Sequence, residues 1–226
     1  MARESQPERR RRAARIAARL ARAYPDAAIA LHHRNPFELL VATILSAQCT
    51  DERVNQVTPE LFRRWPTPAA LARADPAELE AQVRSTGFYR QKAKSLLACA
   101  RGLEERFGGE VPRELEALVS LRGVARKTAN VVRGSAFGLP GLVVDTHVRR
   151  VSQRLELTGE DDPERIERDL MALLPEREWT TFSIRAIHHG RVCCQARKPR
   201  CETCPLRPDC PWPKADAGCH RDGGLE

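Results

Sequence analysis

The segment LRGVARKTANVV, residues 121–132, decides how the chain folds and what it does. A short helical stretch at 115–119 precedes it, 121–125 has the composition of a tight turn, and Arg126 begins a second stretch with apolar residues at helical spacing. This arrangement would point backbone N–H groups and the positive end of a helix dipole outward, which favours phosphate binding. The alternative is an ordinary turn between two packed helices.

Lys127 lies in the first turn of that second helix. Lysines are few among the 38 basic residues and occupy positions 92, 94, 127, 198 and 214. The amine of a lysine can lose its proton and act as a nucleophile, whereas a guanidinium stays charged. Because the helix dipole and the neighbouring Arg126 both favour an uncharged amine here, we expect Lys127 to be a nucleophile.

A carboxylate follows eighteen residues later, at Asp145 in LVVDTHV. Its position just before another helical stretch predicts an N-cap, and that structural role alone would explain the residue. An N-cap is fixed in orientation and can still face a cleft. If the two helices pack side by side, Asp145 as a base and Lys127 as a nucleophile would meet.

Helical periodicity dominates the rest of the chain and predicts an all-α fold. Thr67, Asp75 and Asp162 each precede a proline, which is typical of an N-cap, and Asp75 with Glu78 also fits a capping box. The best strand candidate, 141–144, is short. The expected longer helices span residues 9–24, 37–46, 52–64, 89–107, 126–137, 146–155, 163–174 and 181–191.

The composition favours a soluble protein with an anionic partner. The 226 residues carry a formal net charge of +8, which suits nucleic acid, although a general bias towards arginine would also produce it. Since no apolar run approaches the roughly 20 residues that cross a bilayer, we expect no membrane partner. The basic N-terminal 25 residues resemble a transit peptide in part, but Glu4 and Glu8 favour a basic helix. They lack the apolar segment of a secretory signal, which predicts reduced thiols.

The cysteines indicate a metal site and not a disulfide framework. Four of them follow the spacing C-x6-C-x2-C-x5-C, which suits either a tetrahedral zinc or a [4Fe–4S] cluster. They are Cys194, Cys201, Cys204 and Cys210, whereas Cys49, Cys99, Cys193 and Cys219 lie outside the pattern. The basic loop between the first two ligands would contact phosphate if metal ligation held it in place, or would simply be solvated. Its cations are Arg197, Lys198 and Arg200.

Five motifs together resemble the endonuclease III family, the helix-hairpin-helix DNA glycosylases and AP lyases of base-excision repair. The resemblance extends from about Tyr24 to Cys210. The motifs are PFELLVATILSAQCTDERVN (36–55), STGFYRQKA (85–93), LRGVARKTANVV (121–132), VVDTHVRRV (143–151) and HHGRVCCQARKPRCETC (188–204).

The resemblance implies two helical domains with a DNA-binding groove between them. A six-helix barrel with the helix-hairpin-helix would comprise residues 29–139, and an iron–sulfur domain would comprise 1–28 and 140–226. It assigns a [4Fe–4S] cluster to the four spaced cysteines. The expected partner is double-stranded DNA with damaged bases or abasic sites. The expected protein is a cytoplasmic monomer, associated with the nucleoid if the cell is bacterial.

The resemblance also implies roles for single residues. Lys127 would be the nucleophile, and Asp145 the carboxylate that assists it. Gln48 would fill the gap left by an extruded nucleotide, and Phe88, where the family usually has leucine, would wedge into the base stack. The alternative for Phe88 is a core position. The expected backbone contacts of the hairpin are Arg122, Gly123, Val124, Ala125 and Arg126.

The chain departs from the family's L-P-G-V-G turn at two positions. Arg122 replaces the proline and adds a cation. Ala125 replaces the second glycine, and its Cβ would cost up to roughly 1 kcal/mol if the backbone there needs the freedom of glycine. We expect these changes to affect DNA affinity and not the catalytic pair.

The reaction implied is removal of oxidised pyrimidines, followed by strand cleavage through a lysine Schiff base and β-elimination. One competing assignment is a monofunctional adenine glycosylase, which lacks the lysine and carries a glutamate where this chain has Thr43. Another is a non-catalytic iron–sulfur protein that binds DNA or senses redox state. The presence of both Lys127 and Asp145 favours the lyase over either one.

Overall fold

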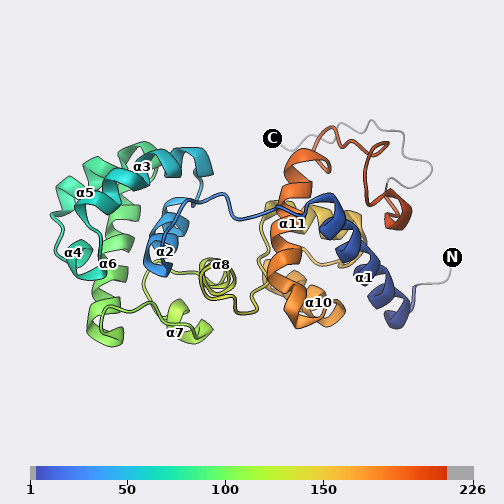
Figure 1. The fold of residues 1–226 in the computed structure, drawn as a ribbon, viewed down its shortest axis with the longest axis horizontal. Coiled ribbons are helices and arrows are strands. Elements are labelled where there is room, and N and C mark those ends of the chain that lie inside the picture. The colour runs from blue at the N-terminus through green and yellow to red at the C-terminus, as the bar shows by residue number, and fades with distance from the viewer. Residues whose placement is uncertain (1–3, 213–226) are drawn as a thin grey trace. The chain divides into compact units, whose positions relative to one another are not determined.

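The computed structural model describes residues 4–212, so Lys214 and Cys219 lie outside the described part of the chain. The chain forms two compact units. Unit 2 is the continuous segment Ile29–Gly141, and unit 1 combines Met1–Ala28 with Leu142–Glu226. Unit 1 is therefore built from segments far apart in the sequence, which lie at the blue and red ends of the colour scale in Figure 1.

Every regular element of the described residues is a helix, which confirms the all-α prediction (Figure 1). All eight longer helices expected from periodicity are present, and the predicted ends are within three residues of the observed ones. The largest difference is at α1, Gln6–Ala23, which begins three residues early because Ser5 and Glu8 form a capping box.

Unit 2 is organised around α2, Pro36–Leu45. This helix is buried on all sides from Phe37 to Leu45 and packs against α3, α6 and α8. A helix that is apolar all round belongs in a core, because no polar face remains for water. The other helices of the unit are α3 (Asp51–Arg64), α4 (Pro68–Ala72), α5 (Pro76–Val83), α6 (Tyr89–Phe107), α7 (Leu115–Val119) and α8 (Arg126–Phe137), with a 3-10 turn η1 at Arg84–Thr86.

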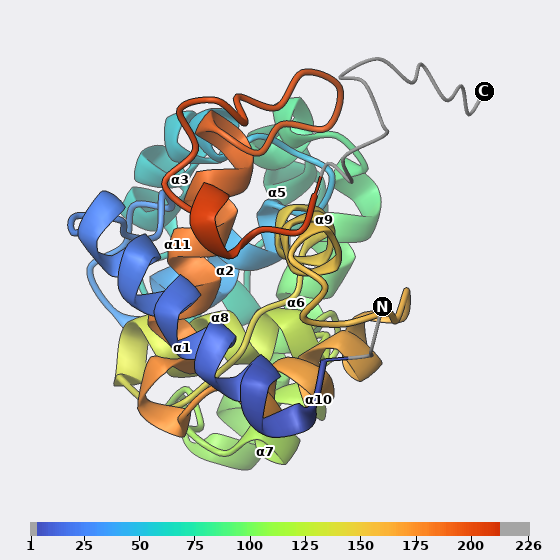
Figure 2. The same cartoon turned by 90° about the vertical axis from the view of Figure 1, so that its right-hand side faces the viewer.

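Unit 1 packs α1 against α11, and α11 in turn against α9 (Figure 2). Its core gathers Ile16 and Leu20 of α1 with Val148 and Phe182 from the C-terminal part. The helices of this unit after α1 are α9 (Thr146–Arg154), α10 (Pro163–Leu173) and α11 (Trp179–Val192), with 3-10 turns η2 at Glu176–Glu178 and η3 at Arg207–Asp209.

Ion pairs fasten the two ends of the chain within unit 1. Arg15 and Arg19 of α1 donate to the two carboxylate oxygens of the buried Asp209, at 2.7 and 2.8 Å. Burial acts to raise the pKa of Asp209, but the two guanidinium groups outweigh it and hold this pKa below its ordinary value. The segment that ends at Cys210 is thus anchored to the first helix.

The predicted N-caps are confirmed. The side chains of Thr67, Asp75 and Asp162 accept hydrogen bonds from the first turns of α4, α5 and α10. The predicted capping box of Asp75 with Glu78 is not formed, because the carboxylate of Glu78 instead accepts a hydrogen bond from Arg64 at 2.6 Å.

Residues 141–144 are extended but form no strand. The backbone N–H of Val143 donates to Ser183 Oγ at 2.9 Å, so this buried donor is satisfied without a sheet. Among residues 4–212 no helix has the length and hydropathy needed to span a bilayer.

Candidate functional site

The turn between α7 and α8 requires glycine at position 123 for two reasons. The Val124 N–H donates to Leu121 O at 3.1 Å and Gly123 has φ +85°, as at the third position of a type II turn. A Cβ on Gly123 would also lie 2.7 Å from the Cβ of Ser95 in α6. The buried side chains of Leu121 and Val124 anchor the turn, while Arg122 is exposed.

Ala125 is the N-cap of α8 and is not strained. Its backbone is extended, with φ −81° and ψ 164°, which any residue adopts. The expected cost of replacing glycine here is therefore wrong, because the positive φ of the turn falls on Gly123. Alanine has no side-chain acceptor, so no side chain caps the first turn of α8. Lys127 is exposed in that first turn, and Arg126 is half-buried.

Gln48 and Phe88 both have left-handed backbones. Their φ values are 51° and 48°, which is uncommon outside glycine. Such strain gathers at functional positions, where the surrounding structure enforces it. The Phe88 side chain is 68% exposed, so the alternative that it belongs to the core is wrong. Unit 2 thus presents an amide and an aromatic ring from two strained loops.

Lys92 is buried close to the loop that carries Phe88, and the sequence patterns assign it no role. Its Nζ donates to Thr86 O at 2.6 Å, two residues before Phe88. Burial lowers the pKa of Lys92, and the Cys49 thiol next to Gln48 acts in the opposite direction. The ammonium is therefore hydrogen-bonded to the backbone just before the Phe88 loop. Lys92 belongs to the motif STGFYRQKA (85–93), but a single sequence does not show that a lysine is buried.

Asp145 is the N-cap of α9, as predicted. Its Oδ1 accepts from the backbone N–H groups of His147 and Val148 at 2.9 and 2.8 Å. These bonds fix the carboxylate and leave Oδ2 without a hydrogen-bond partner among the described residues. Lys127 belongs to unit 2 and Asp145 to unit 1.

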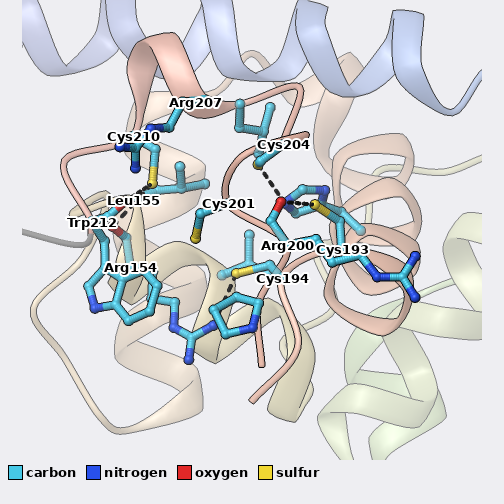
Figure 3. Close-up of a pocket in the computed structure, with 14 residues that line it drawn as sticks. Arg154, Leu155, Cys193, Cys194, Arg200, Cys201, Cys204, Arg207, Cys210 and Trp212 are labelled. Atoms are coloured by element: carbon cyan, nitrogen blue, oxygen red, sulfur yellow. Dashed lines mark hydrogen bonds between the residues drawn. The ribbon is translucent and has the colours of Figure 1, made fainter. Parts of the chain in front are cut away.

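The four spaced cysteines all line one cavity of unit 1 (Figure 3). Burial raises the pKa of Cys204 to about 11 and also raises that of Cys210, so these thiols favour their protonated form until a metal binds. Cys194 Sγ accepts from Arg154 at 3.3 Å, which places a cation beside the sulfur. A convergent set of four thiols with a nearby guanidinium fits an anionic thiolate cluster.

Two arginines of α9 hold Cys194, the first of the four spaced cysteines, and the residues after it in place. Arg150 donates to the carbonyl groups of Gly190 and Cys194, at 2.8 and 3.0 Å. Arg154 donates to Gln195 O and Ala196 O at 2.7 and 2.8 Å. These contacts were not foreseen, because about forty residues separate each pair in the sequence.

The cations of the basic loop all face solvent. All three are exposed: Arg197, Lys198 and Arg200. Both ends of the loop bind the carbonyl of Cys193, which accepts hydrogen bonds from the backbone N–H groups of Gln195 and Arg200. A loop closed in this way keeps its three cations together.

Two further side chains that could ligate a metal, His189 and Cys193, lie close to Cys204. The ligand atoms of His189, Cys193 and Cys204 all lie within 4.8 Å of one another. Burial lowers the pKa of His189 to about 4, so its ring is neutral, and Tyr24 OH lies 2.9 Å from His189 Nδ1. Cys193 lies outside the cysteine spacing that predicted the metal site, and that spacing concerns no histidine.

Comparison with known proteins places the chain in a family. Residues 41–176 match the model of the HhH-GPD superfamily base excision DNA repair proteins. Endonuclease III of Synechocystis is 55% identical over 208 residues, which cover 92% of this chain and 95% of that protein. The chain belongs to the endonuclease III family. Endonuclease III of Bacillus subtilis is 46% identical over 81% of this chain and 84% of its own length.

Solved structures of endonuclease III agree in fold with this family member. A trapped endonuclease III–DNA covalent intermediate matches with a TM-score of 0.85 and 44% identity, over 89% of this chain and 95% of that chain. The chain is accordingly an enzyme of the DNA glycosylase and AP lyase class.

Replacing Gly123 with alanine should destabilise unit 2 more than the same change at Gly138. Both glycines have positive φ, +85° and +64°, but only Gly123 has a neighbour within 4 Å of the added Cβ. We expect a loss of about 1 kcal/mol in the free energy of unfolding for Gly138→Ala and of about 2–3 kcal/mol for Gly123→Ala, measured by denaturant titration. Equal losses would contradict the close packing against Ser95.

Proposed function

We propose that the enzyme removes oxidised pyrimidines from duplex DNA and then cleaves the strand, with Lys127 as its nucleophile. The observation that carries the proposal is the exposed lysine in the first turn of α8, two residues after an N-cap whose side chain accepts no hydrogen bond. The solved endonuclease III that is 44% identical is a trapped covalent intermediate with DNA, which supports covalent chemistry in this family. The choice of oxidised pyrimidines rests on the family resemblance.

The chemistry begins with extrusion of the damaged nucleotide, because no side chain reaches C1′ inside the base stack. The neutral amine of Lys127 attacks C1′, the glycosidic bond breaks, and the base leaves with the bonding electrons. Ring opening gives an imine between Nζ and C1′. The imine acidifies the 2′ proton, whose removal breaks the C3′–O bond on the 3′ side and releases a 5′-phosphate end.

Asp145 supplies the negative charge that this reaction needs. Its free Oδ2 can accept a proton from the attacking amine or face the positive charge that develops on the sugar, while Oδ1 remains bound to α9.

The length of chain between α8 and Asp145 permits the proposed meeting of Asp145 with Lys127. A Cβ on Gly141 would lie 2.7 Å from Asn130 O, so the chain leaves unit 2 in contact with α8, one turn after Lys127. Asp145 is four positions after Gly141 in the chain, and an extended segment of that length spans at most about 14 Å.

Binding of duplex DNA would use exposed groups of both units. The uncapped N-terminus of α8 would hold a phosphate, and Gln48 and Phe88 would occupy the gap in the duplex. Stacking of one base on an aromatic ring is worth about 1–3 kcal/mol. The cations of the basic loop would add phosphate contacts. We infer that a monomer carries out this reaction on chromosomal DNA in the cytoplasm.

A [4Fe–4S] cluster held by Cys194, Cys201, Cys204 and Cys210 would organise the basic loop. When bound, the cluster would contribute folding energy, and no step of the reaction passes through it. Arg150 and Arg154 would hold the first ligand, and the pairs of Asp209 with α1 would hold the last.

The competing assignment as a monofunctional adenine glycosylase would need a carboxylate at position 43, where this chain has threonine. Thr43 is buried in α2, and its hydroxyl donates to Leu39 O at 2.7 Å. It therefore acts within the core of unit 2.

Iron analysis tests the cluster assignment. The protein purified without oxygen should contain about four iron atoms per chain. Cys204→Ser should lose most of this iron, whereas Cys193→Ser should keep it. If instead Cys193→Ser loses the iron as completely as Cys204→Ser, the ligand set is wrong.

Asp145→Asn separates capping from catalysis, because asparagine caps a helix as well as aspartate does. We expect unfolding free energy to change by less than about 0.5 kcal/mol, and excision of an oxidised pyrimidine to slow by about 10²–10⁴-fold. Asp145→Ala should also lose about 1 kcal/mol of stability. Excision by Asp145→Asn at the wild-type rate would show that the residue only caps α9.

Borohydride trapping tests the nucleophile. Incubation with abasic-site DNA and borohydride should reduce the imine and leave a stable covalent complex. Lys127→Arg should still bind the DNA but form no complex, because a guanidinium is not nucleophilic. A wild-type protein that binds abasic DNA and forms no covalent complex would favour a monofunctional glycosylase or a non-catalytic binding protein.

A further inference from the structure

A groove of about 500 Å³ lies on the outer face of α6 in unit 2. Its sides come from α5, from α6 and from the turn before α8. We call it the α6 groove, and its charged lining residues are Glu80, Arg90, Lys94, Arg101 and Arg122.

The α6 groove is strongly positive, with four cations and one carboxylate. Arg90 lies 3.9 Å from Glu80, a weak ion pair, and Arg101 donates to the carbonyl of Ala72 at 3.3 Å. Lys94 and Arg122 have no ion-pair partner within residues 4–212, and both are exposed. Two unpaired cations that line one hollow favour an anionic ligand.

The cations form a row because of helix geometry. Arg90, Lys94 and Arg101 are four and seven residues apart and therefore fall on one face of α6. At 1.5 Å per residue they are separated by about 6 and 10 Å along the axis, a spacing that suits a chain of phosphates better than one small anion. The close approach of Gly123 to Ser95 holds the turn against α6, and Arg122 of that turn lines the same groove as Lys94.

We propose that the α6 groove binds backbone phosphates of the duplex outside the lesion and so extends the contact made by the hairpin. The inference rests on the proposed function, since the same DNA must lie on unit 2. Arg122 stands where the family's turn usually has proline, so part of this positive charge is a departure of this chain from that pattern. Glu80 would weaken the contact by repelling phosphate and by pairing with Arg90.

The salt dependence of DNA binding tests the proposal. The probe is a duplex with a tetrahydrofuran abasic analogue, which is bound but not cleaved. Each of Lys94→Gln and Arg101→Gln should reduce the slope of log K against log salt by about one, and weaken binding about five- to tenfold at 0.1 M salt. Glu80→Gln should tighten binding. The matched control is Arg63→Gln, which removes one exposed charge from α3, where Arg63 pairs with Glu60.

Neutral methylphosphonate linkages locate the contact on the DNA. They are placed one at a time along both strands. At a linkage that Lys94 contacts, the substitution should weaken DNA binding by the wild type but should not weaken binding by Lys94→Gln any further. Thermal unfolding of each variant verifies that the fold is intact. The proposal is overturned if Lys94→Gln and Arg101→Gln have the same DNA affinity and the same salt slope as Arg63→Gln. The groove would then bind another anion, such as an acidic protein.

The two proposals fail in different ways. If the wild type forms no Lys127-dependent covalent complex, the proposed function fails whatever the salt slopes are. If that complex forms and the slopes of the groove variants equal that of the control, only the α6 groove inference fails.

Discussion

The close packing of Gly123 against Ser95 is the contact on which the candidate site depends. Any side chain at position 123 would overlap α6, and the φ of +85° would strain it further. With glycine there, the chain reverses tightly between α7 and α8 and leaves the first turn of α8 without a side-chain cap. N-cap preference alone would favour a serine or aspartate at position 125. With alanine there, no side chain competes with a phosphate for the backbone N–H groups of the first turn of α8.

The first turns of α6 connect the parts of unit 2 that the proposed reaction requires. Phe88 is the N-cap of this helix, the ammonium of Lys92 binds Thr86 O just before Phe88, and Ser95 packs against Gly123 of the hairpin. A lysine buried at such a position is costly unless its ammonium is hydrogen-bonded, and Thr86 O provides the acceptor. The strained backbone of Phe88 is thus held at the start of one well-packed helix.

Local patterns predicted much of this structure from the sequence. Apolar spacing located the longer helices, and proline after threonine or aspartate located three N-caps, because both signals depend on neighbours within a few residues. Contacts between distant residues were not legible, and Arg154 with Cys194 and Arg15 with Asp209 are examples. The error at Ala125 has the same origin, since only coordinates show that Gly123 carries the positive φ.

Peptide mapping of the reduced covalent complex tests the central claim most directly. After digestion of protein and DNA, mass spectrometry identifies which amine carries the deoxyribose fragment. The account predicts that the fragment is on Lys127 and on no other lysine. A fragment on Lys92, on Lys94 or on the N-terminal amine, with unmodified Lys127, would contradict it.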